Sequence, residues 1–272
     1  IKNTNNNHYY LIYGDYSKYF YEEYIFDSNN HLNNKIKVVD NVFSGQTIMD
    51  CAYITTFDQI CCLIQETPPV LSFGFGQQYI TISEDIEEAK FKHLYDDKVA
   101  ILVKETERGV SYYLEVVQIT KNEDSTFSLS SINKYSFSLK QSNLEMMEMS
   151  YINNGTILLT HFNNPQLTIV KYYFRSGDSY SQTISGVPII NQPRIIIFNS
   201  INIVILFSEY DNGEIKYVHI TYPSCSNFEI VLVNSLETAL DFNNYIDTEG
   251  TTLTVLGFDI GLSINDTNNT PI

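Results

Sequence analysis

Six short apolar runs recur along the 272-residue chain and constrain its fold more than any other feature. They are YYLI at Tyr9, CCLI at Cys61, AILV at Ala100, ILLT at Ile157, VILF at Val204 and LTVL at Leu253. Successive runs begin 52, 39, 57, 47 and 49 residues apart. A short apolar run between polar breaks is typical of a buried strand. We therefore predict inner strands at Cys61 to Ile64, Ala100 to Val103, Ile157 to Thr160 and Val204 to Phe207.

Each run is flanked by further strand-like segments. A polar break and a second segment follow it, as in YYLEVVQI and QLTIVKYY, and several of these alternate apolar and polar residues. Alternation of period two indicates a strand with one buried and one wet face. An upstream run such as CAYIT and a downstream run such as SQTISGV bring each unit to four strands. Asn154-Gly155 and Asn212-Gly213 supply the turn chemistry of tight hairpins.

Four antiparallel strands repeated about every 49 residues describe one blade of a β-propeller. In this pattern the chain resembles β-propeller repeat proteins over nearly its full length. The resemblance implies an all-β fold, a β-propeller of about six blades that is incomplete in this chain if some strands lie outside it. It identifies no subfamily, because a chain without Trp cannot carry the Trp-Asp dipeptide. Tandem β-sandwich modules are the alternative fold.

The uneven spacing predicts two irregular blades. The 39-residue interval after Cys61 leaves room only for a short outer strand near YITIS, and the 57-residue interval after Ala100 carries an extra run, YSFSLK. We expect residues 1–272 to form a single propeller domain. Because the chain begins at Ile1 without Met, we expect it to be part of a longer chain whose signal or propeptide has been removed.

The charge balance restricts the partners. Lys and Arg total 16 against 32 Asp and Glu, a formal net charge of -16. Such a field repels phosphate backbones, so we expect no nucleic acid and favour a protein partner that is basic or bridged by cations. A glycan partner stays open. The sequence contains no apolar run of about 18 residues, so we predict no transmembrane segment in this chain.

The four cysteines, Cys51, Cys61, Cys62 and Cys225, are too few for a disulfide framework. One reading is buried, unpaired thiols. Adjacent residues of a strand point to opposite faces, so Cys61 and Cys62 cannot both reach Cys51. If the chain is secreted, Cys51 with one of these two is the expected pair, joined through a turn around Phe57 and Asp58.

No motif identifies a catalytic residue, a cofactor site or a metal site. The five His residues, at 8, 31, 93, 161 and 219, have no metal-ligand spacing. FGFG from Phe73 lacks the context of a phosphate loop and favours a bent strand or bulge. SEDIEEAK, from Ser83, is interpreted as a solvated charge run in a connector. YDNGE, around Asp211, is assigned to a turn rather than to a calcium site.

Two groups of residues are candidate modification or binding sites. Sequons place N-glycosylation at Asn154, Asn265 and Asn268. The tyrosine-rich stretch YGDYSKYFYEEY predicts a partner surface formed by Tyr13, Tyr16, Tyr19, Tyr21 and Tyr24. The alternative for these tyrosines is ordinary packing between strands.

Together these features favour a non-enzymatic β-propeller that is secreted or exposed at the cell surface and serves as an interaction or structural assembly module. A carbohydrate-active propeller, either a glycoside hydrolase or a Tyr-based lectin, is the alternative from another class. An intracellular scaffold in the cytoplasm is the third hypothesis.

Overall fold

The computed structural model describes residues 2–3, 8–15, 18–26, 32–42, 46–66, 68–74, 78–82, 86–105, 111–137, 139, 144–153, 155–163, 166–185, 190–197, 202–209, 215–221, 229–236, 246–247, 252–255 and 258–261. Within these ranges the chain is all-β, with one 3₁₀ turn, η1 (Leu144–Met146). This confirms the predicted all-β class.

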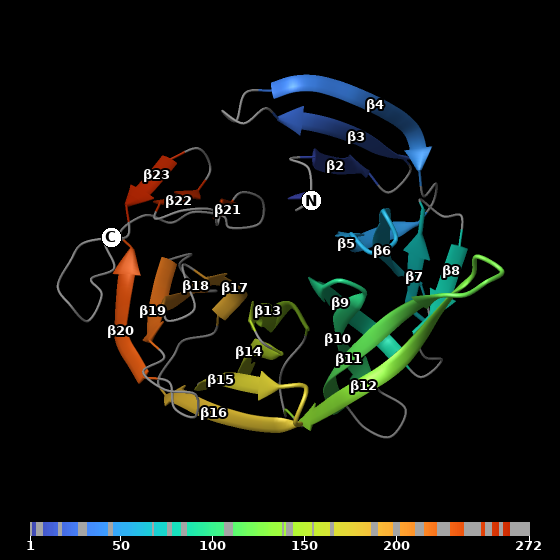
Figure 1. Ribbon diagram of the computed structural model, residues 1–272. Helices are drawn as coiled ribbons and strands as arrows, with labels where there is room; N and C mark the ends of the chain where they lie inside the picture. Colours follow the sequence, from blue (N-terminus) through green and yellow to red (C-terminus); the bar gives the residue numbers. More distant parts are fainter. Residues whose placement is uncertain are drawn as a thin grey trace. The chain divides into compact units, whose positions relative to one another are not determined.

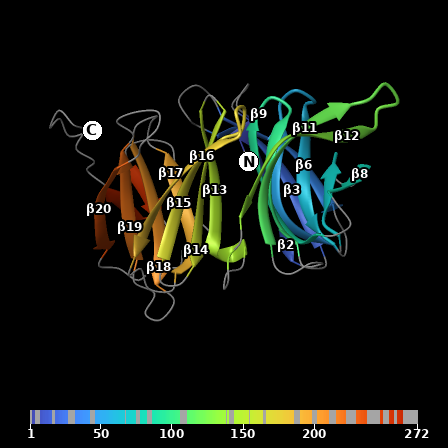
Figure 2. The same ribbon diagram turned by 90° about the horizontal axis from the view of Figure 1, so that it is seen from below.

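The strands form successive antiparallel sheets in which each strand pairs with the next along the chain (Figures 1 and 2). Sheet 1 contains β1 (Lys2–Asn3), β2 (His8–Asp15), β3 (Lys18–Phe26) and β4 (Leu32–Val42). Sheet 2 contains β5 (Thr47–Ile54), β6 (Gln59–Gln65), β7 (Val70–Phe73) and β8 (Gln78–Thr81). Sheet 3 contains β9 (Ile86–Tyr95), β10 (Lys98–Glu105), β11 (Ser111–Lys121) and β12 (Phe127–Phe137).

The same order continues in the second half of the chain. Sheet 4 contains β13 (Met147–Asn153), β14 (Thr156–Asn163), β15 (Gln166–Tyr173) and β16 (Asp178–Ser185). Sheet 5 contains β17 (Ile190–Ile197), β18 (Asn202–Glu209), β19 (Ile215–Thr221) and β20 (Glu229–Leu236). Sheet 6 has three described strands, β21 (Ile246–Asp247), β22 (Thr252–Val255) and β23 (Phe258–Gly261).

The six apolar runs fall on the second strand of a sheet, from β2 to β22, apart from Leu256, which lies outside the described residues. The four strands predicted in detail lie within β6, β10, β14 and β18, which confirms those predictions. The flanking segments are also strands: CAYIT lies mostly in β5, YYLEVVQI in β11 and SQTIS in β16. The period of about 49 residues is therefore the period of one sheet.

Sheet 2 explains why the second strands lack alternation. Cys61 and Leu63 face a core shared with β9, β10, β11 and β12 of sheet 3. Their neighbours Cys62 and Ile64 belong to a separate core, against which Ile12 of β2 packs. Because both faces of β6 are covered, both sets of its side chains must be apolar. Five successive residues, Ile60 to Ile64, are accordingly buried.

Sheets 4 and 5 also share an apolar core. Leu158 and Phe162 of β14, with Leu167 and Ile169 of β15, share a core with Ile203 and Ile205 of β18. An ion pair accompanies this packing, in which Arg194 Nη1 of β17 lies 3.1 Å from Glu148 Oε2 of β13. Sheets 2 and 3, and likewise sheets 4 and 5, are thus joined through apolar cores between their faces.

The fourth strands depart from one prediction. YSFSLK was expected as an extra run, but Tyr135 to Phe137 continue β12. The ladder with β11 shifts register next to Ile132, which is left without a partner residue. This bulge adds one residue to β12 without starting a new strand. The short outer strand predicted near YITIS is confirmed as β8, of four residues.

Two further interpretations, of FGFG and of SEDIEEAK, are corrected by the structure. Phe73 ends β7, and Gly74 takes a positive φ of 60° in a turn, so the described part of FGFG is a strand end rather than a bulge. In SEDIEEAK, Glu87 and Glu88 lie on β9 instead of in a connector. Glu88 Oε1 accepts a hydrogen bond from Lys104 Nζ at 3.1 Å on the paired strand. Asn212-Gly213 and the rest of the turn in YDNGE lie outside the described residues.

Contacts divide the chain into two units, unit 1 (Ile1–Leu139) and unit 2 (Lys140–Ile272). Sheets 1 to 3 belong to unit 1, and sheets 4 to 6 belong to unit 2. The single domain over residues 1–272 stays a prediction.

Candidate functional site

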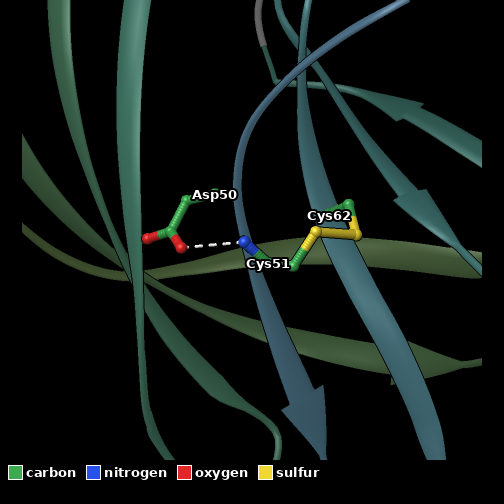
Figure 3. The surroundings of a disulfide bond; sticks show 3 residues. All are labelled: Asp50, Cys51 and Cys62. Atoms are coloured by element: carbon green, nitrogen blue, oxygen red, sulfur yellow. Dashed lines mark hydrogen bonds between the residues drawn. A yellow bond between two sulfur atoms is a disulfide. The ribbon is translucent and has the colours of Figure 1, made fainter. Parts of the chain in front are cut away.

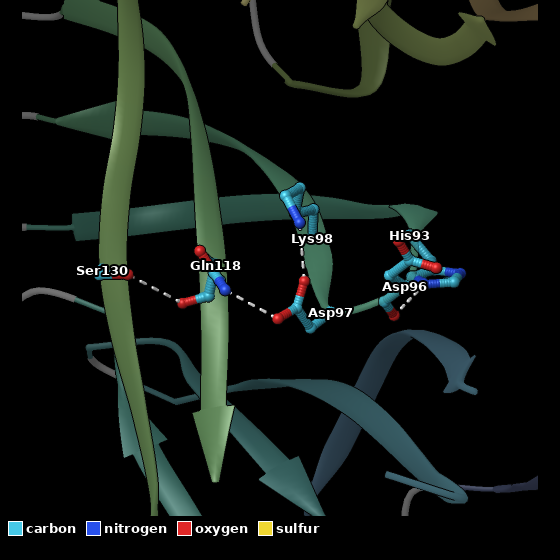
Figure 4. A network of polar contacts seen from close by, with 6 residues as sticks. All are labelled: His93, Asp96, Asp97, Lys98, Gln118 and Ser130. Carbon is cyan, nitrogen blue, oxygen red and sulfur yellow. Dashed lines mark hydrogen bonds and ion pairs between the residues drawn. The ribbon is translucent and has the colours of Figure 1, made fainter. Parts of the chain in front are cut away.

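A polar cluster occupies the turn between β9 and β10 (Figure 4). Asp97 accepts hydrogen bonds on both carboxylate oxygens, from Lys98 Nζ at 2.9 Å and from Gln118 Nε2 of β11 at 2.8 Å. The backbone completes the link, because Ile119 N donates to Asp97 O at 2.8 Å. Gln118 O in turn accepts from Ser130 Oγ of β12 at 3.5 Å. The cluster therefore ties the turn to the outer strands of sheet 3.

The electrostatics of this cluster favour the ionised carboxylate. Burial raises the pKa of Asp97, but the hydrogen bonds from Lys98 and Gln118 outweigh it, so the pKa lies below its ordinary value. The hydrogen bond with Asp97 raises the pKa of Lys98 in return. A carboxylate whose two oxygens are both held by donors is poorly suited to accept a substrate proton. The arrangement fits a structural role, in which Asp97 holds the β9–β10 turn against β11.

His93 contacts the backbone of this turn, at Asp96, rather than the Asp97 carboxylate. Its Nε2 is 3.0 Å from the carbonyl oxygen of Asp96. Burial lowers the pKa of His93, and the hydrogen bond to Asp96 opposes that effect only in part. A neutral ring that donates Nε2–H to the carbonyl is the tautomer that this contact requires. Asp96 itself has a φ of 49°, which the tight turn imposes.

One disulfide joins Cys51 to one of the two adjacent cysteines, as the alternation of side chains along a strand predicts. Cys51 of β5 and Cys62 of β6 are directly opposite in the ladder and form a disulfide, with Cα atoms 4.1 Å apart (Figure 3). The hairpin between them closes through Phe57 N to Ile54 O at 3.2 Å, so the predicted turn around Phe57 and Asp58 is confirmed. Asp50 Oδ1 accepts from Cys51 N at 2.8 Å.

Cys61 points to the other face of β6 and is fully buried as a free thiol. Burial raises its pKa, and the nearby charge of Asp50 raises it further. A thiol that stays protonated is a weak nucleophile and a weak metal ligand. Cys61 is therefore a core residue. The hypothesis of buried, unpaired thiols thus holds for this cysteine. Cys225 lies outside the described residues.

A second polar group lies at the surface of sheet 2. The hydroxyl of Tyr79, on β8, donates to Gln46 Oε1 at 3.3 Å. Gln46 Nε2 then donates to Glu66 Oε1 at 2.7 Å. Tyr79 is 48% exposed, so part of the residue is open to solvent beside the amide of Gln46 and the carboxylate of Glu66. Sequence reasoning missed this group, because its members lie far apart in the chain.

His161 is a second histidine whose pKa is lowered. It sits on β14 opposite Met147 and Thr168, and burial lowers its pKa to about 4. It is therefore neutral at physiological pH. No group of three or more His, Cys, Asp or Glu in the described ranges could hold a metal ion.

The predicted tyrosine surface is described only in part. Tyr13 lies on β2, and Tyr19, Tyr21 and Tyr24 lie on β3. Tyr24 is half-buried, and its hydroxyl donates to Glu22. Tyr16 lies outside the described residues, as do the sequon asparagines Asn154, Asn265 and Asn268. These binding and glycosylation sites stay predictions.

Comparisons with known proteins leave the family open. No family model matches the chain, and no curated protein matches it. The crystal structure at 1.18 Å of an uncharacterized protein, lmo1340 from Listeria monocytogenes EGD-e, aligns with 84% of this chain and 80% of that chain. The TM-score is 0.36 and the identity 11%, a similarity that supports no inference about fold or function. Within the described ranges, no helix is long and apolar enough to cross a membrane.

Proposed function

We propose that the chain is a β-propeller that serves as a non-enzymatic interaction or structural assembly module, secreted or exposed at the cell surface. The observation that carries the proposal is sheet 2, whose two faces are both covered by neighbouring four-stranded sheets. Blades arranged around an axis are packed in this way, whereas a β-sandwich sheet faces one partner and solvent. A rigid stack of blades needs only variable loops and edges to bind a partner.

Two further observations support the location and the kind of partner. The Cys51–Cys62 disulfide fits an oxidising compartment, because such bonds persist mainly in secreted and surface proteins. The net charge of -16 favours a basic or cation-bridged partner. Such an association weakens as salt is added, since long-range attraction is screened over about 8 Å at physiological ionic strength.

The experiment has a structural arm and a functional arm. A crystal structure of the chain tests whether the two units close around one axis, and an open or sandwich arrangement would reject the propeller. A panel of chromogenic glycosides tests for catalysis, and we expect no turnover. Robust turnover abolished by replacing one Asp or Glu would favour the glycoside hydrolase instead.

Affinity capture from surface extracts at low and physiological salt, followed by reconstitution with the purified partner, tests binding.

A Tyr-based lectin is the second candidate, favoured by the exposed group of Tyr79, Gln46 and Glu66. Sugar rings stack on flat aromatic faces, and amide and carboxylate groups hydrogen-bond their hydroxyls. A neutral-glycan array gives the test. If the site binds sugar, Tyr79→Ala abolishes the signal, whereas Tyr79→Phe keeps the ring and most of the affinity. Equal signals from the wild type and Tyr79→Ala would reject this candidate.

A further inference from the structure

The edges of the described four-stranded sheets differ in how they are protected. A free edge exposes unpaired N–H and C=O groups, and proteins block it with short strands, bulges, charges or proline. β1 and β8 have only two and four residues. Register shifts interrupt the ladders of β4, β5, β9, β12, β13, β17 and β20. Every one of these edges therefore carries a protective feature.

The remaining edge strand, β16, is eight residues long and has no register shift and no proline. It pairs with β15 over eight residues without a register shift, from Gln166 opposite Ser185 to Tyr173 opposite Asp178. Its sequence, DSYSQTIS, contains no proline and no Lys or Arg, and its one charge is at its first residue. Six of the eight residues are exposed, including Tyr180 at 42%. β16 is thus long, regular and uncharged over seven residues, and no described strand pairs with its outer edge.

The β16 sequence is complementary to itself. Consider a second copy of the strand running antiparallel, with the two-fold axis at Gln182 and perpendicular to the sheet. Tyr180 then lies opposite Ile184 of the other copy, an aromatic and β-branched pair that stabilises antiparallel sheets. On the other face, Ser181 lies opposite Thr183 and Ser179 lies opposite Ser185. Hydroxyl pairs of this kind also stabilise sheets.

This register places no charge opposite a like charge. Asp178 lies beyond the seven residues that overlap, 179 to 185, so each copy contributes only uncharged side chains to the pairing. The lateral contacts of Tyr180 and Thr183 are already ordered within the sheet. The Tyr180 ring packs edge-on against Tyr173 at 5.9 Å, and Thr183 Oγ1 lies 3.1 Å from Thr168 Oγ1. These two side chains therefore have little freedom left to lose on pairing.

We propose that two copies of this chain associate through their β16 edges, in antiparallel register about Gln182, to form one continuous sheet across a two-fold axis. The interface is isologous, so both copies use the same surface. This inference is independent of the proposed function, because it concerns a second copy and not a foreign partner. The salt dependence of this dimer is also opposite to that of the proposed association with a basic partner. Two chains of charge -16 repel one another, so added salt tightens this dimer.

Sedimentation velocity over a concentration series is the first measurement, at about 20 and 150 mM NaCl. We expect a reversible monomer–dimer equilibrium that shifts toward dimer at the higher salt. The S179K/S185K variant places two lysine pairs in direct opposition and weakens the dimer at least about tenfold. The S179E/S185E variant does the same with carboxylates. Because introduced lysines then face introduced glutamates, an equimolar mixture of the two variants restores the dimer.

The control is S131K/S136K, which adds the same charge at exposed positions of β12 and leaves the dimer unchanged. Thermal unfolding confirms that every variant is folded. A wild-type chain that stays monomeric at all concentrations would overturn the proposal. So would a dimer that survives S179K/S185K, or a variant mixture that stays monomeric, because either result places the interface elsewhere.

Discussion

Burial of His161 links the stability of the fold to pH. The side chain is 8% exposed, and its pKa of about 4 lies below the value of about 6.5 for histidine in an unfolded chain. The unfolded chain therefore binds the proton more tightly. The stability that comes from keeping this ring neutral is complete above pH 6.5 and is lost as pH falls toward 4.

We expect His161→Gln to remove this dependence. The free energy of unfolding of the wild type should fall by up to about 1.4 kcal/mol per pH unit between the two pKa values. The variant is less stable at neutral pH but has a shallower slope. Denaturant unfolding from pH 7 to pH 4.5 measures both. Parallel slopes for the two proteins would contradict the assignment.

Asp97 is the second residue that links the stability of the fold to pH, and here the charged form is the stabilising one. Because its pKa is lowered, its contribution is present above about pH 4 and is lost as pH falls through the folded value. Asp97→Asn keeps the size of the side chain and replaces one acceptor by a donor facing Lys98. We expect a loss of roughly 1 kcal/mol at pH 7, modest because the pair is partly exposed. Glu123→Gln, in an exposed loop, is the matched control.

At the scale of the element, the Cys51–Cys62 bond staples the β5–β6 hairpin. Replacing both cysteines by Ser removes a cross-link over 11 residues of sequence and should cost about 2–3 kcal/mol. Peptide mapping without reductant should recover Cys51 joined to Cys62, with Cys61 as a free thiol. A bridge from Cys225 to Cys61 or Cys62 would mean that the pairing of β5 with β6 is wrong.

The apolar second strands should tolerate no charge. Ile205, on β18, is fully buried between sheets 4 and 5. Ile205→Asp places a carboxylate without a partner in this core and should cost several kcal/mol, enough to unfold unit 2. Ile132→Asp makes the same change at a bulge residue that is 37% exposed. Its melting temperature should change little, and equal losses in the two variants would contradict the burial pattern.

For the whole molecule, the net charge of -16 opposes compaction. We expect the melting temperature to rise as NaCl increases from about 10 to 150 mM, because salt screens repulsion between the carboxylates. Dilute chain, below the range in which copies associate, keeps dimer formation from contributing. A melting temperature that falls with salt would show that attractive ion pairs such as Arg194–Glu148 dominate instead.

The sequence alone determined where the second strand of each sheet lies. Apolar runs such as CCLI are visible because β6 is covered on both faces, so nothing polar can be placed there. Local chemistry also allowed one bridge from Cys51, since adjacent strand residues point in opposite directions. The choice of Cys62 over Cys61 needed the register, which places Cys51 opposite Cys62. A shift of one residue would have reversed it.

Only the tertiary structure decided which polar residues meet. Gln46, Glu66 and Tyr79 come from three segments, and Asp97 meets Gln118 through pairing between β10 and β11. Such contacts leave no period or motif in the sequence, because single hydrogen bonds place no constraint on neighbouring residues. The unprotected edge of β16 was likewise hidden, since bulges and register shifts are properties of paired strands. A sequence specifies what each strand must bury, whereas the ladder between strands decides which side chains are brought together.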